Sequence, residues 1–162
     1  MNSIEQEKLP VMISVRGEQY FDDVDPNATE LMTEGTLEQT EDGFLLSYQE
    51  TELTGMEGTL TTFEIGPRRV ILRRSGSVSS QMVFEEGQQH TSLYETPYGT
   101  MTLDIVTRTL RADLDETGGE LEIRYAIEIE HQITGTSRFF IQVRQNTAAE
   151  AEKQNVKNGK GW

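Results

Sequence analysis

The sequence predicts an all-β fold, a single closed up-and-down barrel of about eight to ten antiparallel strands. Apolar residues recur with period two rather than 3.6, which is the spacing of strands with one buried face. Turn signals separate these runs at intervals of roughly ten residues, as in sandwiches and barrels. No amphipathic helix pattern occurs between residues 9 and 146. Closure is expected because it removes exposed strand edges.

Each expected strand alternates between apolar and polar positions. The clearest is LEIRYAIEIE, in which Leu121, Ile123 and Tyr125 share one face while Glu122 and Arg124 share the other. The remaining strands follow from the same alternation, at Val11/Ile13/Val15, Leu31/Thr33/Gly35/Leu37, Phe44/Leu46/Tyr48, Phe63/Ile65, Val70/Leu72, Val78/Met82/Phe84 and Phe139/Ile141/Val143. We expect the apolar members to face the barrel interior.

Short turns connect these strands. Glycine-containing turns lie at 41–43, 54–58, 66–68, 75–77, 85–87, 96–99, 116–119 and 134–135. In the turn TPYG, Pro97 suits the second position of a type I turn, and Gly99 supplies the positive φ of a three-residue hairpin loop.

Two places interrupt the rhythm. The alternation changes phase within TMTLDIVTRTL, which predicts a β-bulge near Ile105–Val106. The acidic, proline-containing segment 18–30 is expected to be a long loop between the first two strands. The domain organisation predicted is a flexible N-terminus over 1–8, a barrel domain over 9–146 and a flexible or short helical tail over 147–162.

The formal net charge of −14 excludes several classes of partner. The two ends carry equal numbers of lysines and glutamates, so the excess lies in the body of the chain and repels nucleic-acid phosphates and anionic membranes. No apolar run is long enough to cross a bilayer, and the first residues show no signal-peptide pattern. Without cysteine, disulfides and thiolate chemistry are excluded. We expect a cytoplasmic protein.

Catalytic and metal motifs are not found in the sequence. The two histidines, His90 and His131, have no metal-ligand partner at a recognised spacing, and no nucleophile elbow or phosphate-binding loop occurs. The acidic run DDVDPN has the spacing of a calcium loop, but Ala28 stands where the sharp turn needs glycine. We therefore predict no catalytic residues, no metal, no cofactor and no enzymatic activity.

The run RRVILRR supplies the most informative charges. Parity with Val70 and Leu72 points Arg74 into the barrel, and the expected bulge turns Arg108 inward as well, beside Tyr125. Buried arginines are costly unless they are paired or bind an anion. Two alternatives stay open: a carboxylate or phosphate site in the lumen, or arginines at the barrel rim that pair with glutamates.

Tyrosines extend this candidate site. Tyr48 has inward parity, while Tyr94 and Tyr98 flank the TPYG turn. The two rings either lean over the barrel mouth above Arg74 or lie on the outer wall. The candidate ligand residues are Arg74, Arg108, Tyr125, Tyr94, Tyr98 and Tyr48.

Several segments together resemble a known family. RRSGSVSSQMVFEEGQQHTSLYETPYGTM, SYQETELTGMEGTLTTF and LDETGGELEIRYAIEIEH are similar to the YwiB-like family of small bacterial proteins, over roughly residues 9 to 146. The resemblance implies a calycin-like (lipocalin-like) β-barrel of unknown function and transfers no catalytic residue. Ligand binding in the lumen is an analogy at the level of fold.

Two functions are predicted from these observations. The first is a non-enzymatic barrel that binds a small anionic or amphipathic ligand in the lumen or at its mouth. The second is a barrel filled by its own side chains, which acts as a structural or protein-interaction module through its acidic outer surface. The sequence leaves a homodimer open.

Overall fold

Ten strands form one closed antiparallel barrel, as the sequence predicts. The computed structural model describes residues 8–20, 27–77, 79–129 and 132–147, without the side chains of Tyr94 and Thr96. The elements are β1 (Lys8–Tyr20), β2 (Asn27–Gln39), β3 (Phe44–Gln49), the 3₁₀ turn η1 (Glu52–Thr54), β4 (Leu60–Ile65), β5 (Arg69–Ser75), β6 (Ser79–Glu85), β7 (Gln89–Thr96), β8 (Gly99–Asp115), β9 (Gly118–Ile129) and β10 (Gln132–Gln145).

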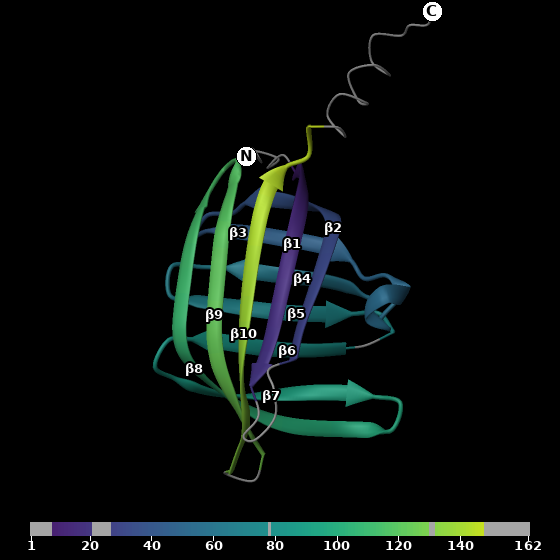
Figure 1. The fold of residues 1–162 in the computed structure, drawn as a ribbon, viewed down its shortest axis with the longest axis vertical. Coiled ribbons are helices and arrows are strands. Elements are labelled where there is room, and N and C mark those ends of the chain that lie inside the picture. The colour runs from purple at the N-terminus through teal and green to yellow at the C-terminus, as the bar shows by residue number, and fades with distance from the viewer. Residues whose placement is uncertain (1–7, 21–26, 78, 130–131, 148–162) are drawn as a thin grey trace, which may run out of the picture.

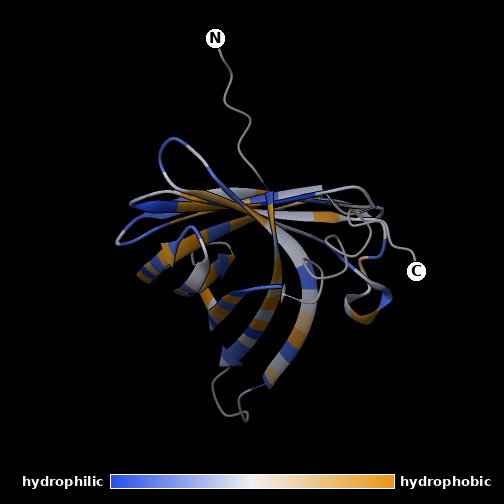
Figure 2. Cartoon of the chain, turned by 90° about the horizontal axis from the view of Figure 1, so that it is seen from above, coloured by the Kyte–Doolittle hydropathy of each residue, from blue (hydrophilic) through white to orange (hydrophobic). Residues whose placement is uncertain are grey.

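Each strand pairs with its neighbours in the sequence, and β1 closes the barrel against β10. Figure 1 shows that β8, β9, β10, β1 and β2 run steeply across the front, while β3 to β7 cross behind them almost at right angles. The barrel is therefore flattened into two layers that pack face to face. Bands of hydrophobic and hydrophilic residues alternate along the strands in Figure 2.

Gly35 lies where β2 leaves the front layer and begins to pair with β3. A Cβ atom at this position would lie 2.4 Å from the backbone oxygen of Ser47 and 2.5 Å from Cδ1 of Ile13. Only glycine lets the two strands approach this closely at the corner. The corner is the reason that the ten strands enclose a narrow core.

The interior is filled largely by apolar side chains from both layers. Phe84 and Tyr125 have ring centroids 4.9 Å apart, Tyr125 and Phe139 5.7 Å, and Phe63 and Phe139 6.5 Å. These contacts join β4 and β6 at the back to β9 and β10 at the front. Aromatic pairs at such distances add to the stability gained by burial.

A β-bulge occurs in β8, but it lies at Arg108 rather than at Ile105–Val106. Thr107 pairs with Tyr125 and Thr109 pairs with Arg124, so Arg108 is the extra residue. Ile105 and Thr107 consequently keep the inward phase, and Leu110 resumes it after the bulge. The alternation of the sequence indicated that one residue is inserted, but the polar Thr107 concealed where the phase changes.

Two loops differ from the expectation. The predicted loop over 18–30 is shorter, because β1 continues to Tyr20 and β2 begins at Asn27; the candidate calcium loop falls largely on 21–26, outside the described residues. In the TPYG turn, Thr96 pairs with Gly99, so two residues rather than three form the loop. Of the predicted ends over 1–8 and 147–162, residues 1–7 and 148–162 lie outside the described residues, and Lys8 belongs to β1.

Candidate functional site

Arg74 points into the barrel from the last part of β5, as its parity with Leu72 predicts. Its cross-strand neighbours are Thr61 on β4 and Ser80 on β6. The side chain is only 14% exposed, and its Nε lies 3.9 Å from Oε2 of Glu50. A buried guanidinium therefore lies at the end of the back layer, with one carboxylate close to it.

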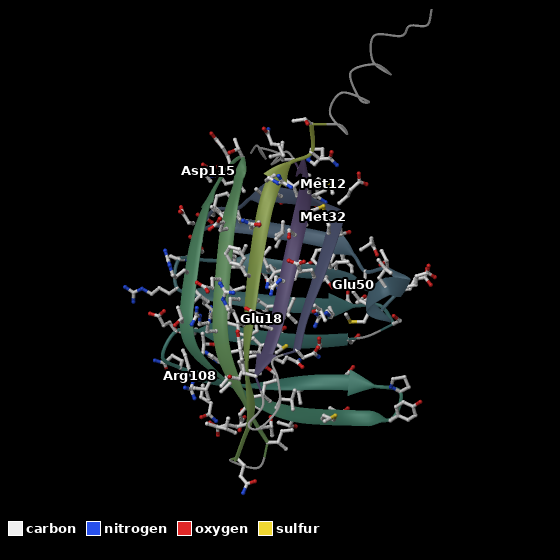
Figure 3. All side chains as sticks on the ribbon, in the orientation of Figure 1. Met12, Glu18, Met32, Glu50, Arg108 and Asp115 are labelled. Atoms are coloured by element: carbon white, nitrogen blue, oxygen red, sulfur yellow. The ribbon has the colours of Figure 1, made fainter. Side chains whose placement is uncertain are left out.

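Glu50 is held in place by hydroxyl groups. It follows β3 directly, and its side chain is 1% exposed. Thr61 donates its hydroxyl to Oε2, and Thr54 of η1 donates to Oε1 over 2.9 Å. Figure 3 shows Glu50 beside η1 at the end of the back layer. Both carboxylate oxygens thus have a donor that does not depend on Arg74.

Two buried tyrosines lie within the electrostatic reach of Arg74. Burial raises the pKa of Tyr48 well above its usual range, the negative charge of Glu50 raises it further, and the positive charge of Arg74 lowers it. Burial also raises the pKa of Tyr125, against the opposing effects of its hydrogen bond with Ser137 and of Arg74. Both phenols consequently stay protonated at neutral pH and can donate hydrogen bonds.

Three further hydroxyls are buried without a partner among the described residues. They belong to Ser80, Ser92 and Thr107, which are 9%, 3% and 1% exposed. Ser80 on β6 is the cross-strand neighbour of Arg74, and Thr107 on β8 is the cross-strand neighbour of Tyr125. Ser92 lies on β7. Nε of Arg74 is likewise buried without a hydrogen bond. Buried polar groups normally have partners, so Nε of Arg74 and the hydroxyl of its cross-strand neighbour Ser80 indicate a place for a polar ligand.

A groove of about 590 Å³, which we call the rim groove, lies on the outer wall of the back layer and extends to the end of β5 and the start of β6. Most of its lining faces outward, including Thr62, Glu64 and Arg73, and Arg74 and Ser80 line it at its rim. Leu60 and Leu93, which are 38% and 57% exposed, and Glu95 also line it. A second, smaller pocket of about 260 Å³ opens between β1, β2 and β10 and reaches Tyr125.

The structure brings together half of the predicted ligand residues. Arg74, Tyr48 and Tyr125 face the interior near one another, which confirms their predicted orientation. Arg108 was predicted to point inward, but it is exposed on the outer wall because the bulge falls on it. Tyr98 is 99% exposed at the tip of the β7–β8 hairpin.

The side chain of Tyr94 lies outside the described residues, so its predicted role stays a prediction. Its backbone pairs with Ser80 on one side and Met101 on the other. Figure 1 shows the β7–β8 hairpin extending beyond the barrel wall rather than folding across an opening. Tyr98 therefore does not cover the lumen.

Sequence reasoning missed the polar residues that surround Arg74. Each continues the parity of an apolar neighbour: Glu50 follows Tyr48, Thr61 precedes Phe63, and Ser80 precedes Met82. A search for polar residues in the inward phase would have found Thr61 and Ser80, which lie within strands, but not Glu50, which follows the end of β3. In the arginine run, Arg73 pairs with Glu64 on the outer wall, and Arg74 lies inside near Glu50. An anion site in the lumen stays a prediction.

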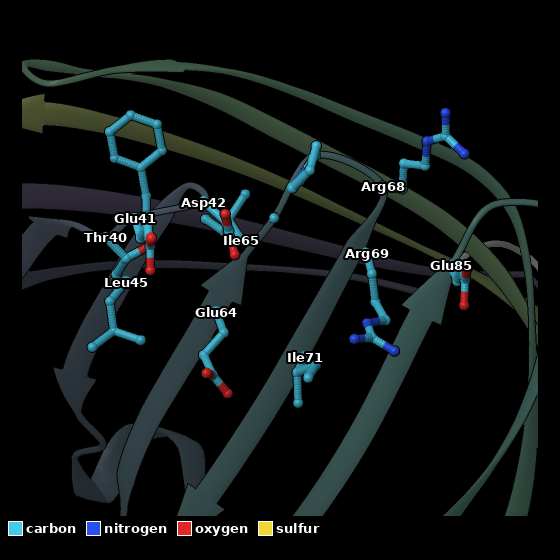
Figure 4. A pocket seen from close by; sticks show the side chains of 13 residues that line it. Thr40, Glu41, Asp42, Leu45, Glu64, Ile65, Arg68, Arg69, Ile71 and Glu85 are labelled. Atoms are coloured by element: carbon cyan, nitrogen blue, oxygen red, sulfur yellow. The ribbon is translucent and has the colours of Figure 1, made fainter.

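Another groove of about 590 Å³ lies on the outer wall at the opposite end of the same strands. Figure 4 shows its mixture of charges, with Arg69 between Glu64 and Glu85 and with Leu45 and Ile71 as apolar members of the lining. Its arginines are exposed, unlike Arg74. Across the described residues no group of three or more side chains could hold a metal ion, and no helix is long and apolar enough to span a bilayer.

Residues 13–141 match the family described as Domain of unknown function (DUF1934). The chain belongs to this family. The barrel it forms is similar to the crystal structure of the ywiB protein from Bacillus subtilis, with a TM-score of 0.77, 22% identity and coverage of 87% of this chain and 95% of that one. In sequence it is 26% identical over 124 residues to the "Uncharacterized beta-barrel protein YwiB" of Bacillus subtilis (strain 168), which covers 76% of this chain and 85% of the relative. This confirms the family that the sequence resembles and its β-barrel fold.

Proposed function

We propose that this member of the DUF1934 family is a non-enzymatic binding protein for a small amphipathic monocarboxylate. The carboxylate lies at Arg74 and Ser80, where β5 ends and β6 begins, and the apolar part passes over the barrel rim onto the outer wall along the rim groove. The observation that supports this most directly is the buried Nε of Arg74, which has no hydrogen-bond partner although it lies beside the unpartnered hydroxyl of Ser80. A carboxylate accepts from both groups and removes the cost of leaving them unpaired.

The apolar part of the ligand follows from the lining of the rim groove. Leu60 and Leu93 are exposed large apolar side chains on the outer wall, in the same groove lining as Arg74 and Ser80. The volume of about 590 Å³ falls within the range of small-molecule pockets, which are largely apolar with a few fixed polar groups. Covering these leucines adds hydrophobic free energy of about 25 cal/mol for each Å² of apolar area removed from water.

The charge of the ligand is limited by the carboxylates nearby. Glu50 lies 3.9 Å from Arg74 and already balances most of its charge. Glu64 and Glu95 line the same groove. A ligand with several negative charges, such as a nucleotide, would meet repulsion from each of them. A single carboxylate suits this balance best.

Binding rather than catalysis is proposed because the tyrosines near Arg74 are poised as donors. Their raised pKa values keep Tyr48 and Tyr125 protonated at neutral pH, which makes them unsuitable as general bases. His90 interacts instead with Glu85, across the β6–β7 hairpin, at 2.9 Å. The proposed setting is the cytoplasm.

Native mass spectrometry of the protein purified from cells tests this proposal, followed by titration of decanoate into the apoprotein. We expect a bound organic acid below about 300 Da, a size that suits a groove of about 590 Å³. Arg74→Met is expected to weaken decanoate binding at least tenfold, and Leu93→Asp to weaken it similarly. Met101→Asp is the control, since Met101 is equally exposed on the same hairpin but outside the groove. Equal binding by all three variants would refute the proposal.

A packed interior supports a second candidate function, a module that binds a basic protein through its acidic surface. The aromatic cluster fills the centre of the barrel, so the outer wall offers most of the accessible area. Cross-linking in cells followed by salt-dependent pull-down tests it. A basic partner released at high salt supports this function, and a monomer without partners contradicts it.

A further inference from the structure

Three arginines form a row across the outer wall of the front layer, away from the rim groove. Arg138 on β10 is the cross-strand partner of Arg124 on β9. On its other side Arg124 pairs with Thr109 of β8, which directly follows the bulged Arg108. Glu18 on β1 ends the row on the other side. Figure 3 shows Glu18 and Arg108 at the two ends, on β1 and β8.

The row lines a groove of about 560 Å³, which we call the arginine groove. Its other lining residues include the small polar side chains of Thr109, Thr136 and Ser137, and Tyr20, which is 41% exposed. A bulge re-aims the side chain of the inserted residue. Here it places a third guanidinium beside two others on adjacent strands.

The carboxylates of the wall satisfy only part of this positive charge. Arg138 donates to Glu18 over 2.7 Å and to Glu122 over 2.6 Å. Arg124 shares the same oxygen of Glu122 at the longer distance of 3.3 Å. Among the described residues, Arg108 has no ion pair or hydrogen bond. Like charges on neighbouring strands are destabilising without a counter-charge, so the groove attracts carboxylates.

We infer that the arginine groove binds an acidic segment of a partner polypeptide. Arg138 already binds Glu18 within the groove and Glu122 beside it, which shows the type of group that its guanidinium accepts. Guanidinium groups match the planar geometry of a carboxylate with two parallel hydrogen bonds. Arg108 and Arg124, whose side chains are exposed, provide the remaining donors.

A polypeptide is favoured over a small acid because the groove is open. Single exposed ion pairs contribute only about 0.2–1 kcal/mol, so one carboxylate would bind too weakly to be retained. Several carboxylates on one chain bind together, because the first contact raises the local concentration of the next. The groove crosses four strands and has room for consecutive acidic side chains.

Titration of the ¹⁵N-labelled protein with a blocked hexaglutamate peptide tests the inference, with blocked hexaglutamine and inorganic phosphate as the other arms. We expect shifts at the amides of 108, 124 and 138 with hexaglutamate alone, and at least tenfold weaker binding to R108Q/R124Q. The matched control is R68Q/R69Q, which removes two exposed arginines of the opposite wall and leaves the affinity unchanged.

Three outcomes overturn the inference. One is the absence of shifts with hexaglutamate, and another is equal weakening by both double variants, which would indicate only a general loss of positive charge. The third is phosphate binding as tight as hexaglutamate binding at the same amides, which would make the groove a phosphate site. These results are independent of decanoate binding at Arg74, because none of the changed residues lines the rim groove.

Discussion

Replacing Glu50 by glutamine removes the charge that balances Arg74 while keeping the shape of the side chain. The two charges lie 3.9 Å apart, which corresponds to an attraction of about 4 kcal/mol at an effective dielectric constant of about 20. Thr61 and Thr54 still contact the amide of the variant. Arg74 has no other ion-pair partner among the described residues, so its buried charge is left uncompensated. We expect Glu50→Gln to lower the free energy of unfolding by about 3–4 kcal/mol.

Arg74→Met should cost less than Glu50→Gln. The carboxylate of Glu50 keeps two hydroxyl donors when Arg74 is removed, and methionine fills much of the space. We expect a loss of about 1–2 kcal/mol, and a double variant that is more stable than the sum of the single losses predicts by at least about 1.5 kcal/mol. Urea unfolding at pH 7 measures all three variants.

The order of these two losses decides whether the reasoning holds. If Glu50→Gln stays within about 0.5 kcal/mol of the parent protein, as neutral surface substitutions do, Arg74 is not held by Glu50. Additive losses in the double variant would also contradict a direct interaction. A Thr62→Val variant on the outward face of β4 is the control, because the hydroxyl of Thr62 contacts that of Ser47 at 3.3 Å rather than Glu50 or Arg74.

Three other results are expected from the structure. Gly35→Val should lower the free energy of unfolding by about 3 kcal/mol or prevent folding, because the new Cβ would lie 2.4 Å from a backbone oxygen of β3. A melting temperature equal to that of the parent protein would show that the backbone at this corner can move. The raised pKa of Tyr48 contributes stability that is complete below pH 10 and is lost as the pH rises further. Tyr48→Phe should therefore reduce the loss of stability between pH 10 and 12. An alkaline unfolding profile equal to that of the parent protein would contradict this role of Tyr48. Arg138 lowers the pKa of Glu18 and Glu122, which therefore stabilise the fold above about pH 4.5 and lose this effect in acid. Arg138→Gln should make the free energy of unfolding depend less on pH in acid, as monitored by circular dichroism. An acid unfolding curve equal to that of the parent protein would exclude this role of Arg138.

The alternation of the sequence was sufficient to predict the barrel and the inward side of Arg74. Period-two patterns depend only on the geometry of the strand, so the orientation of Leu72 fixes that of Arg74. The position of the bulge was not predictable in the same way, because Thr107 is polar yet only 1% exposed. A polar side chain in the inward phase reads as an outward one, and this error turned Arg108 to the wrong face.

The partners of Arg74 were also beyond the sequence, for a different reason. Glu50 lies after the end of β3, where parity alone does not say whether a side chain turns back into the barrel. Its orientation depends on η1, whose Thr54 donates to it, and on Thr61 across the ladder. Contacts of this kind join residues that the sequence separates, and they appear only when the strands are placed in register.

Electron density around Arg74 tests the central proposal most directly. Crystals of protein purified from cells without refolding, diffracting well enough to distinguish water from an organic acid, would show what Nε of Arg74 and Oγ of Ser80 bind. The account predicts a carboxylate within hydrogen-bond distance of both atoms and an apolar chain along Leu60 and Leu93. Ordered water alone at these two atoms, with the rim groove otherwise filled by solvent after soaking in decanoate, would contradict it.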